Sequence, residues 1–194
     1  MNAIRLFFLF ACLPLLAGAA DEPIRIACIG DSLTQGAKVN AATESYPAQL
    51  QKILGPHFTV KNFGVGGATM MRRGKPTAFG QLPRALAFNP NIIVVAFGTN
   101  DSRSRGVDYW NHIDEFVPDA TAIIDQLAAL PTSPRILLCL PASHMADLPG
   151  MPAERRENNT ERVPRMQEIR KLLEGLAEKM RAKKVTLVDL ETPT

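Results

Sequence analysis

Three short segments of this sequence carry residues that could perform nucleophilic chemistry on an ester. Ser32 lies two residues after an apolar run that stops abruptly at Gly30. A glycine-rich segment, residues 64–67, follows a second apolar run. Asn100 follows a third apolar run, residues 92–97. A serine hydroxyl attacks a carbonyl only when a base takes its proton and fixed donors stabilise the resulting oxyanion. These segments therefore supply a candidate nucleophile and candidate oxyanion donors.

Each of these residues suits a distinct part in acyl transfer. Ser32 would attack the ester carbonyl, and its own N–H could face the oxyanion. Gly64, Gly66 and Gly67 could each offer a backbone N–H, because glycine lets the main chain approach a substrate without a Cβ in the way. Asn100 could donate its side-chain amide without titrating. Asp31 could brace the turn that holds Ser32, since acids favour such positions.

The chemistry-bearing segments follow strands in a regular alternation of strand and helix patterns. Short apolar runs of the kind buried on both faces of a parallel sheet predict strands over 24–29, 58–63, 92–97, 136–140 and 185–188. Apolar residues at helical spacing predict helices over 46–54, 79–87, 111–130 and 161–183. This alternation predicts a three-layer α/β/α sandwich with a mostly parallel sheet, whose carboxyl edge gathers the three segments.

In this order the three segments resemble the SGNH hydrolases, also called GDSL-type esterases and lipases. Ser32, Gly67 and Asn100 match the first three family blocks, and the family pattern of a glycine two residues before a threonine selects Gly67 over Gly66. The resemblance implies a flavodoxin-like, five-stranded sheet in the order 2-1-3-4-5. It also implies catalysis through an acyl-enzyme on Ser32, with no metal and no organic cofactor.

The fourth family block, an Asp-x-x-His that supplies the base, has no match in the 194 residues. His57 precedes the second strand, on the wrong edge of the sheet, and His112 lies four residues after Asp108, not three. His144 follows the fourth strand on the correct edge and could contact substrate. The family pattern makes Asp189 structural, because an Asp often closes the fifth strand there.

Two explanations of the missing base remain open. Either residues 21–194 form an SGNH domain cut before its last loop and helix, or the protein has lost the base and kept the cleft. The stretch 191–194 looks like the start of the next family loop, so we expect the first. On that expectation the chain as it stands is nearly inactive.

The segment from Gly98 to Pro141 resembles sialate O-acetylesterase-like members and related carbohydrate esterases. The resemblance favours short-chain, acetyl esters on carbohydrates. Two alternatives stay open: a lysophospholipase or thioesterase, and a non-catalytic domain that binds carbohydrate in the same cleft.

The N-terminal segment, the net charge and the cysteines indicate where the protein is expected to act and which partners it is expected to lack. Residues 1–20 combine Arg5, an apolar core and small residues before a cleavage site, which predicts a secretory signal peptide and a secreted or periplasmic protein. The formal net charge of +3 is small and its basic residues are dispersed, so we expect no nucleic-acid partner and, after cleavage, no membrane span. Cys28 and Cys139 lie in separate strands and are expected to be buried thiols.

Overall fold

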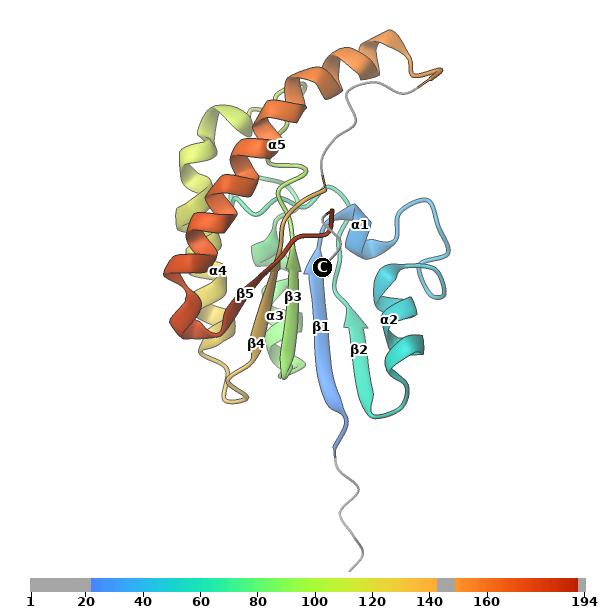
Figure 1. The fold of residues 1–194 in the computed structure, drawn as a ribbon, viewed down its shortest axis with the longest axis vertical. Helices are drawn as coiled ribbons and strands as arrows, with labels where there is room; N and C mark the ends of the chain where they lie inside the picture. The colour runs from blue at the N-terminus through green and yellow to red at the C-terminus, as the bar shows by residue number, and fades with distance from the viewer. Residues whose placement is uncertain (1–21, 143–148, 192–194) are drawn as a thin grey trace, which may run out of the picture.

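The computed structural model describes residues 22–142 and 149–191, which form a five-stranded parallel sheet with helices on both faces (Figure 1). The strand order is β2-β1-β3-β4-β5, which confirms the predicted order. The strands are β1 (Ile24–Gly30), β2 (Phe58–Asn62), β3 (Ile92–Ala96), β4 (Arg135–Cys139) and β5 (Val185–Val188). Because all neighbours are parallel, the loops after β1, β2 and β3 open on one edge.

The main hydrophobic core lies on one face of this sheet. Alternate strand residues, such as Ile29 of β1, Val95 of β3 and Leu138 of β4, are almost completely buried there. They pack against α3 (Leu82–Ala87), α4 (Phe116–Ala128) and α5 (Ala153–Lys179). On the opposite face α2 (Tyr46–Leu54) packs against β2, with bounds that match the predicted helix.

Three predicted helices differ from the observed ones. The helix predicted over 79–87 is divided into a 3₁₀ turn, η1 (Ala78–Gly80), and α3. The helix predicted over 111–130 is likewise divided into η2 (Trp110–Glu115) and α4, because the backbone of His112 is not helical. Apolar spacing alone does not separate a tight 3₁₀ turn from a continuing α-helix.

The last helix, predicted over 161–183, begins eight residues earlier than expected. α5 starts after Pro152, runs through Pro164 and ends at Lys179, and a 3₁₀ turn, η3 (Arg181–Lys183), follows. Its buried residues begin only at Met166, so its first turns project past the core and carry no apolar stripe. Apolar periodicity therefore could not have indicated them.

The cysteine and signal-peptide expectations have different outcomes. Cys28 and Cys139 are buried free thiols in β1 and β4, with β3 between them, as expected. Residues 1–20, the predicted signal peptide, lie outside the described residues. Within the described ranges no helix is both long enough and apolar enough to cross a bilayer.

Gly98, at the end of β3, gives a test of how tightly α5 is held against the sheet edge. Its φ is +116°, and an added Cβ would lie 2.9 Å from Ile169 Cγ2 and 3.2 Å from Pro141 Cγ. Gly98→Ala combines this overlap with a backbone conformation that costs a side chain about 1–3 kcal/mol. We expect it to lower the free energy of unfolding by at least about 2 kcal/mol in urea titrations.

Gly80→Ala is the matched control, since an added Cβ there meets nothing within 4 Å. Equal stability of the two variants would show that Gly98 is not a tight contact between β3 and α5.

Candidate active site

The turn that presents Ser32 is built by Asp31. β1 ends at Gly30, and α1 (Ser32–Gln35) is a single helical turn whose N-cap is Asp31. Asp31 Oδ1 accepts a hydrogen bond from Leu33 N at 2.9 Å, which confirms that this acid braces the turn. Ser32 is the first residue of the turn and is half-buried. At that position a backbone N–H has no partner within the helix, so it is free to face a developing oxyanion.

The strand end before this turn is held by Gln81, a residue at the start of α3. The side chain of Gln81 is buried and bonds the Gly30 peptide twice: its Oε1 accepts from Gly30 N at 3.2 Å, and its Nε2 donates to Gly30 O at 3.0 Å. Only glycine fits at position 30, because an added Cβ would lie 2.1 Å from Thr34 Oγ1. The carboxamide of Gln81 therefore fixes the position of the Gly30 peptide, and with it the start of the turn that carries Ser32.

The segment after β2, residues 63–69, is the glycine loop, and it runs directly beside α1. Val65 N donates to Gly30 O at 3.0 Å, and Asn62 Nδ2 donates to Thr34 O at 2.8 Å. A Cβ added to Gly64 would lie 2.3 Å from Gln35 N, so the two backbones touch. These contacts bring the second predicted segment against the first.

Of the two candidate glycines, Gly66 lies close to Ser32: a Cβ added to Gly66 would be 4.0 Å from Ser32 Cβ. Gly67 has a φ of +79°, and a Cβ added there would have Pro76 Cδ, at 3.8 Å, as its nearest neighbour. The choice of Gly67 stays a prediction from the family pattern.

Asn100 reaches across to the glycine loop. Its Nδ2 donates to Ala68 O at 3.0 Å, so its side chain spans from the loop after β3 to the loop after β2. This contact is not the local turn that Asn often makes with its own backbone. A carboxamide nitrogen carries two hydrogens, so one N–H remains for a substrate oxygen.

Asp101 joins the same two loops from below. Its side chain is completely buried, and its two carboxylate oxygens accept from Met70 N at 3.1 Å and from Met71 N at 3.0 Å. Burial raises the pKa of Asp101 to about 6, against the lowering effect of these two hydrogen bonds. The negative charge of nearby Asp31 raises this pKa further.

Arg162 of α5 places a positive charge behind the site. Its Nε donates to Ser102 Oγ at 2.9 Å, and its Nη2 donates to Thr99 O. Burial raises the pKa of Asp31, and the Arg162 guanidinium partly offsets this effect. Burial and the charges of Arg103 and Arg165 lower the pKa of Arg162 to about 10, so it remains a cation at neutral pH.

Neither His57 nor His112 contacts the hydroxyl of Ser32, which forms no hydrogen bond within the described residues. His57 lies at the amino edge, where its carbonyl accepts from Ile24 N at 2.9 Å. His112 Nε2 lies 3.3 Å from Asp108 Oδ2, on the surface of η2. His144 lies outside the described residues.

Asp189 is engaged in an ion pair rather than presented to the site. Arg170 Nη2 donates to Asp189 Oδ1 at 2.9 Å, and Arg170 Nη1 donates to Pro141 O at 2.9 Å. The pair therefore ties the ends of β4 and β5 to α5, which fits the structural role expected for Asp189.

Sequence reasoning missed Gln81, the buried carboxylate of Asp101 and Arg162. Gln81 and Arg162 belong to no motif, Asp101 ends the segment that carries Asn100, and each of the three acts on a segment at least 30 residues away. The one available signal was the acid at position 101, directly after Asn100. Among the described residues no group of three or more His, Cys, Asp or Glu side chains is placed to hold a metal ion.

The comparisons with known proteins agree with this geometry. Residues 28–194 match the GDSL-like lipase/acylhydrolase family, and the chain belongs to that family of ester hydrolases. An acetylxylan esterase from Xylanibacter ruminicola is 38% identical over 141 residues, which is 62% of this chain and 29% of the relative. The chain thus matches less than a third of that relative's length.

Solved structures share the fold at low sequence identity. The aryl esterase of M. smegmatis superposes with a TM-score of 0.66 at 22% identity, over 86% of this chain and 83% of that one. An acetylxylan esterase from Geobacillus stearothermophilus superposes with a TM-score of 0.61 at 17% identity, over 87% and 76%. These likenesses confirm the α/β fold with the 2-1-3-4-5 sheet.

The buried carboxylate of Asp101 predicts a measurable pH dependence of stability. Its pKa is about 6 in the folded protein, against about 3.9 for an unfolded Asp. Because the folded protein binds this proton more tightly than the unfolded chain, protonation of Asp101 stabilises the fold fully below about pH 4. This contribution is lost as the pH rises from about 4 through 6. The free energy of unfolding of the wild type, minus that of Asp101→Asn, should therefore fall by roughly 2 kcal/mol between pH 4 and 7.

Urea titrations at several pH values measure this difference, with the exposed Asp114→Asn as the control for losing one carboxylate. A difference that stays constant, or grows with pH, would mean that the carboxylate of Asp101 is not desolvated in the folded protein.

Proposed function

We propose that this protein is a secreted or periplasmic serine esterase of the SGNH type that removes acetyl groups from carbohydrates. The observation that carries the proposal is the convergence of Ser32, the glycine loop and Asn100 at one edge of the sheet, through the contacts to Gly30 O and Ala68 O. The family match and the acetylxylan esterase relative support the same reading. The signal-peptide pattern in residues 1–20 supports export.

In the proposed reaction Ser32 Oγ attacks the ester carbonyl and the alcohol leaves, so that an acyl-enzyme forms. The oxyanion is held by Ser32 N, by Gly67 N and by the second N–H of the Asn100 amide. Water then attacks the acyl-enzyme and releases the acid. Donors fixed in place before the reaction stabilise the oxyanion without any reorganisation, which is usually the largest single contribution to such catalysis.

The general base is the remaining requirement. We propose that it comes from an Asp-x-x-His block, as in the family, and that the 194 residues by themselves hydrolyse esters slowly. Without a base, a serine hydrolase retains only the rate enhancement of its oxyanion hole and of binding, about 10³–10⁴ over water.

Substitution of Ser32 tests the proposed nucleophile. In a form of the protein that carries an Asp-x-x-His block, Ser32→Ala should abolish 4-nitrophenyl acetate hydrolysis, because the other hydroxyl near the end of β1, that of Thr34, is completely buried. Stopped assays with the purified variant measure this loss. If the variant keeps more than roughly a tenth of the wild-type turnover, Ser32 is not the nucleophile, whereas a wild type without turnover would favour the non-catalytic, carbohydrate-binding alternative.

Substitution of Asn100 tests the proposed oxyanion donor. In the same background, Asn100→Ala should lower kcat by roughly 10²–10³ and leave KM within a few-fold, because the amide acts on the transition state. Steady-state kinetics with acetate and octanoate esters measure both constants and also compare the acetyl esterase with the long-chain alternative. An effect confined to KM would assign Asn100 to substrate binding.

A further inference from the structure

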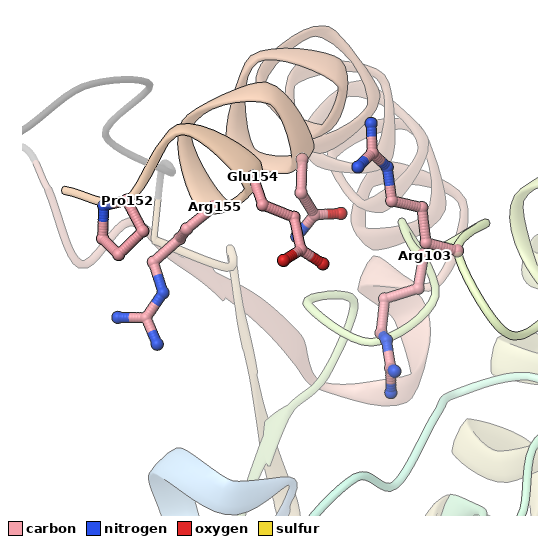
Figure 2. Close-up of a pocket in the computed structure, with 6 residues that line it drawn as sticks. Arg103, Pro152, Glu154 and Arg155 are labelled. Carbon is pink, nitrogen blue, oxygen red and sulfur yellow. The ribbon is translucent and has the colours of Figure 1, made fainter.

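A pocket of about 410 Å³ lies between the loop after β3 and the first turns of α5 (Figure 2). We call it the arginine pocket, and its lining consists of Arg103, Arg105, Pro152, Glu154, Arg155 and Asn158. Figure 2 shows Glu154 and Arg155 on α5, with Arg103 on the facing loop. The volume is within the range of small-molecule sites, so the pocket can hold a sugar unit.

Positive charge exceeds negative charge in and around this pocket. Arg105 is neutralised, because its Nη2 lies 3.2 Å from Glu157 Oε2 and 3.0 Å from Glu161 Oε1. The side chains of Arg103 and Arg155 form no ion pair or hydrogen bond within the described part of the chain. Glu154 is the one carboxylate among the lining residues.

Two further arginines intensify this imbalance. Burial lowers the pKa of Arg162, and repulsion from the charges of Arg103 and Arg165 lowers it further. The counter-charge of Glu161 is shared between Arg105 and Arg165, whose Nη2 lies 3.9 Å from Glu161 Oε2. An anion bound at Arg103 would relieve part of this repulsion, so the pocket suits a ligand with a negative charge.

The arginine pocket adjoins the turn that carries the proposed oxyanion donor. Arg103 N donates to Asn100 O at 3.1 Å, so one turn of the loop carries Asn100 on one side and the pocket wall on the other. Arg162 anchors the same turn from α5 through Thr99 O. A substrate whose acyl group meets Asn100 can therefore extend a neighbouring unit toward Arg103.

The lining residues narrow the chemistry of that unit. Guanidinium groups match the geometry of a carboxylate with two parallel hydrogen bonds. Asn158 and Glu154 can bond sugar hydroxyls, whereas no lining residue is aromatic, so a neutral sugar has no ring on which to stack. We propose that the arginine pocket is a subsite for a carboxylate-bearing sugar, a uronic acid unit, in the carbohydrate ester that the protein hydrolyses. This subsite rests on the proposed function for its connection to an ester substrate.

Direct binding tests the subsite without requiring turnover, so its failure is distinct from failure of the esterase proposal. Calorimetry with the full chain should compare a xylo-oligosaccharide that carries one glucuronic acid branch with the same oligosaccharide lacking the branch. We expect the acidic ligand to bind at least about tenfold more tightly, as one hydrogen-bonded ion pair provides. Free glucuronate should bind more weakly than the branched oligosaccharide.

The variants assign the effect to named residues. Arg103→Gln and Arg155→Gln should each remove most of the preference for the acidic ligand. Arg135→Gln, an exposed arginine at the start of β4 on the opposite edge of the sheet, should keep the preference. Arg155 is exposed on α5, so its substitution leaves the fold intact even if Arg103→Gln does not.

Three results would overturn the proposal. They are equal binding of the two oligosaccharides, a preference that persists in Arg155→Gln, and free glucuronate that binds as tightly as the branched oligosaccharide. The last result would describe a general anion site rather than a substrate subsite.

Discussion

The edge of the sheet that holds the candidate active site depends on one buried carboxylate, that of Asp101. Asp101 lies completely inside the protein and accepts hydrogen bonds from two successive backbone N–H groups, Met70 and Met71. It thereby ties the loop after β2 to the loop after β3, and Asn100 makes the parallel contact to Ala68 O directly above. A buried carboxylate is costly unless it is well bonded, so the two loops gain stability mainly when they are together. The relative position of glycine loop and amide follows from that constraint.

The same edge of the sheet contains a second buried acid, Asp31, and the cost of burying its charge is offset in a different way. Asp31 bonds Leu33 N as a helix cap, and the cation of Arg162 offsets part of the cost of burying its charge. Arg162 also bonds Thr99 O, so one side chain of α5 holds the turn before Asn100 and partly offsets the electrostatic cost of burying Asp31. The site is thus assembled by polar groups of three separate chain segments, whereas the apolar core below it supplies the sheet on which they stand.

Sequence patterns predicted most of the framework, because a strand buried on both faces and a helix packed on one face each leave an apolar signature. They identified all five strands to within one residue at each end, the bounds of α2, and the edge that gathers Ser32, Gly67 and Asn100. Sequence patterns failed where hydrogen bonds, charges or local backbone geometry, and not apolar packing, determine the structure. The first turns of α5 are polar and project past the core, and the kink at His112 depends on local backbone geometry. Gln81, Asp101 and Arg162 act through hydrogen bonds to distant backbone atoms, which no spacing rule encodes.

The central claim is that the three segments form one oxyanion hole around Ser32. The most direct measurement is a crystal structure of the phosphonylated protein, prepared with a fluorophosphonate in a form that carries an Asp-x-x-His block. We expect phosphorus on Ser32 Oγ, and a phosphonyl oxygen about 2.7–3.1 Å from Asn100 Nδ2, Ser32 N and Gly67 N. The same structure would decide between Gly66 and Gly67. An adduct on another residue, or a phosphonyl oxygen that points away from Asn100, would contradict the account.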